Sequence, residues 1–77
     1  MNERIIGKIK RLEESIEEAR KSRDDTFNAM QAALARGAGV ISFKEAASIA
    51  HSVNLIAGVN HAIDDMETQV AFLKSLS

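Results

Sequence analysis

The stretch from Arg36 to Ser42 lies almost at the middle of the 77-residue chain and interrupts an otherwise continuous helical pattern. Gly37 and Gly39 can adopt positive φ angles, so they can end one helix and reverse the direction of the chain. Ser42 and Glu45 have the S-x-x-E spacing of a capping box, which predicts the start of a second helix. Because the chain contains no proline, we expect two long helices, about residues 2–36 and 43–76, joined by a turn at 37–42.

The first predicted helix carries apolar residues at alternating spacings of three and four, from Ile5 through Ile9, Leu12 and Ile16 to Met30. This spacing is typical of a coiled-coil seam. The opposite face is almost entirely charged, and we interpret it as a solvent-exposed face, with a partner-binding face as the alternative.

The second predicted helix has a broader apolar side, on which an aliphatic residue recurs every seven positions. A seven-residue repeat implies left-handed supercoiling against a neighbouring helix. The apolar arc is too wide for the narrow stripe of the first helix, so we expect part of it to contact another copy of the chain. The residues predicted for this oligomer interface are Ile49, Ile56, Val59, Ile63, Met66, Val70 and Leu73.

These patterns predict an all-α fold, in which residues 1–77 form a single antiparallel helical hairpin. A lone hairpin has only two layers and would bury too little apolar area to offset the entropy of ordering its chain. We therefore expect a homodimeric four-helix bundle, with a larger ring or hexamer as the alternative.

Arg23 falls at the centre of the apolar arc of the first helix, where the seven-residue spacing from Ile9 and Ile16 leads. The antiparallel register predicts that Arg23 comes within reach of Asn60, with Asp64 one turn away. One interpretation is a polar layer that fixes the register of the two helices. The other is a site for a small anionic ligand, for which the candidate residues are Arg20, Arg23, Asn60, His61 and Asp64.

A stripe of polar and small residues follows the remaining face of the second helix. We interpret it as a solvent-exposed face, with a partner-binding groove as the alternative. The residues of this candidate partner-binding face are His51, Asn54, Gly58 and Asp65.

Several function classes lack the residues that they need. There is no cysteine, and His51 and His61 lie about 15 Å apart along a helix. The sequence therefore predicts no metal site within one chain. No nucleophile–base pair or carboxylate dyad has a useful spacing, because the adjacent acids Asp24-Asp25 and Asp64-Asp65 diverge by about 100° on a helix. We expect a non-enzymatic protein without a cofactor, and, since no membrane span or signal is visible, a cytoplasmic one.

Three functions remain as hypotheses. The first is a small oligomeric protein that binds and regulates or inhibits a partner protein, of the kind found among adaptors and phage or plasmid accessory proteins. The second is a binder or sponge of a small anionic ligand, such as a nucleotide, in a pocket between subunits. The third is binding of structured RNA through basic residues of the first helix, namely Lys8, Lys10, Arg11 and Lys21.

In outline the chain resembles Rop-type RNA-binding hairpin dimers, although no motif residue of that family is matched. Against nucleic-acid binding stand the net charge of −1 and the acidic residues Glu13, Glu14, Glu17 and Glu18 among the basic ones.

Overall fold

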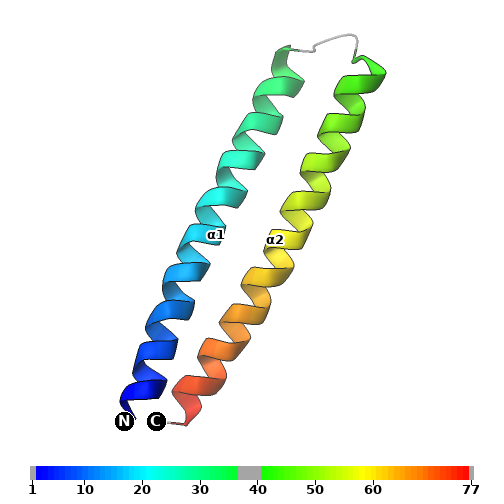
Figure 1. Cartoon of the computed structure of the whole chain (residues 1–77). Coiled ribbons are helices and arrows are strands. Elements are labelled where there is room, and N and C mark those ends of the chain that lie inside the picture. The colour runs from blue at the N-terminus through cyan, green and yellow to red at the C-terminus, as the bar shows by residue number, and fades with distance from the viewer. Residues whose placement is uncertain (1, 37–40, 77) are drawn as a thin grey trace.

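The computed structural model describes residues 2–36 and 41–76 and consists of two long helices, α1 (Glu3–Arg36) and α2 (Phe43–Ser75). The helices run antiparallel, so that the start of α1 and the end of α2 lie at one end of the molecule, and the end of α1 and the start of α2 lie at the other (Figure 1). The predicted all-α hairpin is confirmed, and each predicted helix boundary agrees with the structure to within one residue. The turn residues Gly37 and Gly39 lie outside the described residues.

Each helix begins at a polar residue whose side chain caps the first turn. At α1 the Asn2 side chain accepts a hydrogen bond from the Arg4 N–H (2.8 Å). At α2 the Ser42 hydroxyl accepts one from the Glu45 N–H (3.1 Å), as the capping box predicts. These bonds satisfy N–H groups that a helix leaves unpaired at its start.

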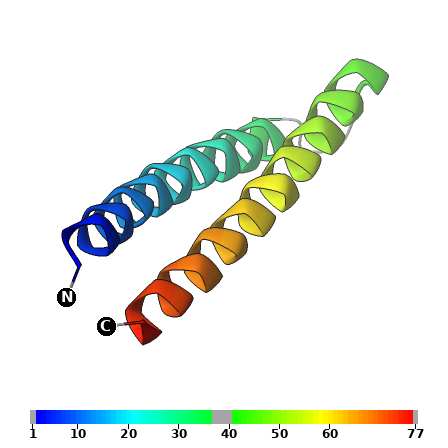
Figure 2. The same ribbon diagram turned by 60° about the horizontal axis from the view of Figure 1, so that its bottom comes forward.

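The hairpin is a thin rod with principal extents of 57 × 14 × 13 Å. Figure 2 shows α1 and α2 side by side, and within residues 2–36 and 41–76 no further element packs on them. None of the described helical segments is both apolar enough and long enough to cross a lipid bilayer.

The core of the hairpin is small and lies in the half that contains the termini. Within residues 2–36 and 41–76 the buried hydrophobic side chains are Ile9, Ile16, Ile63 and Val70. Six partly buried side chains pack around them, namely Ile5, Leu12, Ala19, Val59, Met66 and Leu73. The half nearest the turn has no buried side chain among the described residues, and its inward positions, such as Arg23, Met30 and Ile56, are only half-buried.

Candidate interaction surfaces

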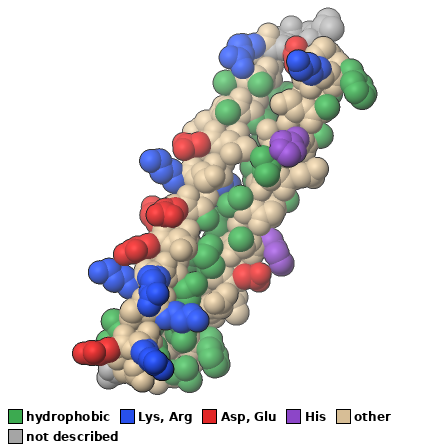
Figure 3. Space-filling model, viewed as in Figure 1, with side chains coloured by type: hydrophobic (Ala, Val, Ile, Leu, Met, Phe, Trp, Pro, Cys, Tyr) green, Lys and Arg blue, Asp and Glu red, His purple; other side chains and the backbone are tan. Residues whose placement is uncertain are grey.

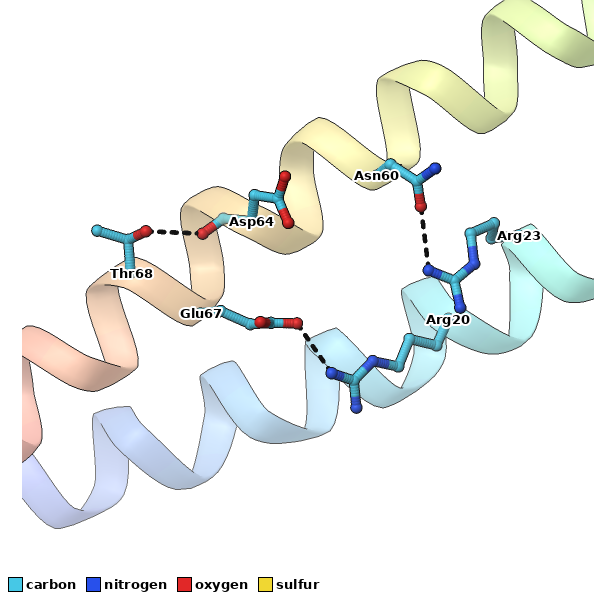
Figure 4. A network of polar contacts seen from close by, with 6 residues as sticks. All are labelled: Arg20, Arg23, Asn60, Asp64, Glu67 and Thr68. Atoms are coloured by element: carbon cyan, nitrogen blue, oxygen red, sulfur yellow. Dashed lines mark hydrogen bonds and ion pairs between the residues drawn. The ribbon is translucent and has the colours of Figure 1, made fainter.

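A cluster of polar side chains bridges α1 and α2 near the middle of the rod (Figure 4). Arg23 Nη1 donates a hydrogen bond to Asn60 Oδ1 (3.0 Å), and Arg23 Nε donates to Asp24 Oδ1 (3.2 Å). One turn nearer the termini, Arg20 Nη2 lies 2.8 Å from Glu67 Oε1. The contact predicted between Arg23 and Asn60 is therefore present, and Arg20 adds an ion pair that the sequence analysis did not anticipate.

Asp64 and His61 do not join this cluster. The backbone carbonyl of Asp64 accepts a hydrogen bond from Thr68 Oγ1 (2.9 Å), and the structure shows no bond between the Asp64 carboxylate and Arg23 or Asn60. His61 Nε2 lies 3.6 Å from Asp65 Oδ2, and both side chains are exposed. Of the five candidate ligand-binding residues, one chain brings together Arg20, Arg23 and Asn60 only.

Acidic groups surround the two arginines of the cluster. Arg20 pairs with Glu67 and Arg23 with Asp24. A shallow hollow beside Arg20 is lined otherwise by Lys21 and four acids, which are Glu17, Glu18, Asp24 and Asp25. A single chain therefore does not concentrate positive charge at this point, so the structure gives an anionic ligand little electrostatic attraction here.

The basic residues proposed for RNA binding are distributed over different parts of α1. Lys8 and Arg11 line one hollow, Lys10 lines a second one beside Glu13 and Glu14, and Lys21 lies among the acids near Arg20. Phosphate groups along a duplex are bound by a continuous basic surface, which this arrangement does not provide within one chain.

The seven residues predicted for the oligomer interface all lie on the side of α2 that faces α1. Ile63 and Val70 are buried within the single chain, and Val59, Met66 and Leu73 pack against them. Ile49 and Ile56 are half-buried. These side chains thus already contribute to the hairpin itself, and their contact with a second copy stays a prediction.

A first exposed surface of the hairpin follows one edge and uses residues of both helices. Each of its residues directly follows an inward-facing position, and the residues recur every seven positions. We call this surface the mixed edge, and it comprises Glu13, Arg20, Phe27 and Leu34 on α1 with Val53, Asn60, Glu67 and Lys74 on α2. Its half nearest the turn contains three exposed large apolar side chains. Phe27 is 44%, Leu34 42% and Val53 50% exposed.

A second exposed surface lies on α2 alone. Its residues are spaced three or four apart, so they share one face of the helix. We call this surface the outer strip, and it comprises His51, Leu55, Gly58, Ala62, Asp65, Gln69 and Phe72. It contains three of the four candidate partner-binding residues, and Asn54 lies beside it.

The outer strip combines exposed apolar side chains with small residues, Gly58 and Ala62, at its centre. Leu55 is 48% and Phe72 63% exposed, and a Cβ atom added at Gly58 would meet no atom within 4 Å. On the face of the molecule drawn in Figure 3, charged side chains gather over α1. Hydrophobic side chains lie along the boundary between the two helices and on α2. By their spacing Leu55 and Phe72 belong to the broad apolar side that the sequence predicts for this helix, yet the structure leaves both on its surface.

Among the described residues, no group of three or more His, Cys, Asp or Glu side chains could hold a metal ion. Asp24 and Asp25, like Asp64 and Asp65, are exposed neighbours on a helix.

Comparison with known proteins gives no match to a family model, to a curated protein or to a solved structure. The assignment of function therefore has to come from the surfaces of the hairpin.

Proposed function

We propose that this chain is a non-enzymatic protein-binding module, which self-associates as a homo-oligomer of hairpins and regulates or inhibits a partner protein. The observation that carries the proposal is the presence of large apolar side chains on two separate exposed surfaces of a rod with a very small core. Scattered single hydrophobic side chains are normal on a protein surface, but apolar groups that recur along one edge or strip are typical of interaction sites.

The outer strip supports binding of a partner protein. Its small residues, Gly58 and Ala62, would allow another helix to approach closely, while Leu55 and Phe72 supply apolar contact area on either side. His51 and Asp65 provide polar groups within the same strip. This combination of apolar anchors and a few polar groups suits a helix of the partner protein that packs along α2.

The other two hypotheses have less support. An anionic ligand would have to compete with Glu67 and Asp24 for the guanidinium groups of Arg20 and Arg23. RNA would meet basic side chains that are dispersed among acids. A protein partner on the outer strip would leave both the arginine contacts and the dispersed basic residues as they are. The absence of cysteine fits our expectation of a cytoplasmic module.

Photo-crosslinking in the native host cells tests the proposal directly. A photoreactive amino acid replaces Leu55 in the centre of the outer strip, and the adducts are identified by mass spectrometry. We expect a covalent adduct with one particular protein of the host, together with any adduct between copies. When the purified partner is then titrated with the hairpin, Leu55→Asp should weaken binding by roughly tenfold or more, since it places a charge against an apolar contact.

The matched control carries the same photoreactive amino acid at Glu14, which lies exposed on the charged outer face of α1. This control should give no adduct with that partner. A Leu55 adduct pattern that is limited to copies of the chain itself, or that equals the Glu14 pattern, would contradict partner binding through the outer strip.

A further inference from the structure

The ion pair between Arg20 and Glu67 links the two helices along the mixed edge. Because the helices are antiparallel, a step of seven residues up α1 corresponds to a step of seven residues down α2. Seven residues are about two turns, or about 10.5 Å along the rod. Starting from this ion pair, the edge repeats as four successive pairs, which we call levels: Glu13 with Lys74, Arg20 with Glu67, Phe27 with Asn60, and Leu34 with Val53. The long Arg20 and Glu67 side chains reach one another along the rod (Figure 4).

The two levels nearest the termini are charged, and the levels nearest the turn are mainly apolar. Glu13, Arg20, Glu67 and Lys74 line one common hollow, which shows that these four side chains share one side of the hairpin. At each charged level one helix contributes an acid and the other a base, and the signs are exchanged between the two levels.

The hairpin has a small core, and the apolar levels of the mixed edge leave large hydrophobic side chains exposed beside it. The four buried residues all lie toward the termini, whereas Phe27, Leu34 and Val53 remain 42–50% exposed toward the turn. A chain of this length buries a modest fraction of its surface even when it is compact, and a two-layer rod buries less. Helices of four-helix bundles commonly bury a third position of the heptad besides the two seam positions.

We propose that a second copy of this chain packs against the mixed edge in a parallel arrangement, with a two-fold axis along the rod and both turns at the same end. The inference rests on the self-association that is part of the proposed function, and it adds the surface and the orientation. The product is a four-helix bundle in which α1 of each copy lies beside α2 of the other copy at the same level.

Charge complementarity argues for the parallel orientation. The two-fold axis places each α1 between its own α2 and the α2 of the second copy. Arg20 then lies between two Glu67 carboxylates, and Glu13 lies between two Lys74 ammonium groups, while like charges sit on the diagonals of the bundle. At the levels nearest the turn, Leu34 meets Val53 of the second copy, so apolar side chains cover one another.

The antiparallel orientation loses this match. With the axis across the rod, the level of Leu34 and Val53 lies opposite the level of Glu13 and Lys74 of the second copy. Charged side chains would then be covered by apolar ones, which removes water from them without providing a new partner. An antiparallel overlap of the turn halves alone would keep the apolar contacts but would bury only about half of the edge.

Distances between spin labels in the purified protein distinguish these arrangements. Because the chain has no cysteine, a single introduced cysteine labels one site. Ser48→Cys labels α2 near the turn and Ser75→Cys labels it near the termini. The parallel dimer predicts that both distances between copies are below about 30 Å, since a bundle is only two or three helix diameters wide. A full-length antiparallel dimer predicts about 50 Å between the Ser75→Cys labels and about 35–40 Å between the Ser48→Cys labels, given the rise per residue of a helix.

Two matched substitutions test the surface itself. Leu34→Glu on the mixed edge should raise the dissociation constant of the dimer by roughly a hundredfold or more, because it buries a charge among apolar side chains. Leu55→Glu on the outer strip introduces the same charge at an exposed leucine and should change the constant by less than about threefold. Sedimentation equilibrium measures both, and circular dichroism verifies that both variants stay helical at high concentration.

The outcomes separate this inference from the proposed function. Long distances at both labels, or a dimer that dissociates with Leu55→Glu and not with Leu34→Glu, would overturn the parallel mixed-edge dimer while self-association stands. A monomer at all concentrations would overturn both. Photo-crosslinking to a partner through Leu55 does not depend on either result.

Discussion

At the scale of single residues, Arg23 is the clearest test of whether a polar group in the seam serves structure or ligand binding. The side chain is half-buried and bonded to Asn60 and Asp24. We expect Arg23→Leu to raise the free energy of unfolding by about 1 kcal/mol, because a leucine would extend the apolar seam and the bonds that are lost are partly exposed. Urea denaturation at one fixed protein concentration measures the change.

Arg11→Leu is the matched control for Arg23→Leu, because Arg11 is exposed on α1. It should stay within about 0.5 kcal/mol of the original chain. A destabilisation by Arg23→Leu of more than about 1 kcal/mol would show instead that the bond to Asn60 stabilises the hairpin more than an apolar side chain would.

The same arginines lead to a prediction about nucleotides. Arg20 and Arg23 donate hydrogen bonds to Glu67, Asn60 and Asp24, so we expect titration of the purified protein with nucleoside mono- and diphosphates to release no saturable heat. Isothermal calorimetry makes the measurement. Saturable heat that disappears in Arg23→Leu would favour the anionic-ligand hypothesis over the protein-binding one.

At the scale of the helices, the structure predicts that α2 is anchored mainly by its half nearest the C-terminus. Ile63 is 3% exposed in the core, whereas Ile56, one heptad earlier, is half-buried. Ile63→Val should destabilise the hairpin by about 1 kcal/mol, since it removes a buried methylene group. Ile56→Val removes the same group from a more open site and should cost less than half as much. Equal costs in urea denaturation would contradict the one-sided core.

The start of α2 gives a second test at this scale. Ser42 accepts a hydrogen bond from the Glu45 N–H, so Ser42→Ala should cost about 1 kcal/mol of helix stability. Hydrogen exchange should speed up for the amide of Glu45 and its neighbours in the first turn. Ser48→Ala, at an exposed position within the same helix, serves as the control and should leave these exchange rates unchanged. Equal exchange in both variants would mean that the cap contributes nothing.

Sequence reasoning succeeded for features that depend on one helix or on an approximate register. Heptad spacing and the capping box predicted both helices, and the antiparallel model was accurate enough to bring Arg23 to Asn60. The apolar spacing places Phe27 and Leu34 in the seam of the first helix, so it does not predict the mixed edge, on which the structure leaves these two side chains 44% and 42% exposed. Nor could it tell that the core is confined to one half, since Ile56 and Ile63 occupy equivalent heptad positions and differ only in what lies opposite them.

At the scale of the whole molecule, a rod with four buried side chains among its described residues should depend on association for its stability. If the folded state is a dimer, each tenfold increase in protein concentration adds about 1.4 kcal/mol to the apparent stability per mole of dimer. The thermal midpoint followed by circular dichroism should therefore rise steadily over a wide range of concentration. Leu34→Glu is the matched control, because a variant that cannot close the mixed edge should melt at a lower temperature with less dependence on concentration. A midpoint of the original chain that stays constant on dilution would mean that the hairpin is stable alone, and the apolar levels of the mixed edge would then be free for a different protein.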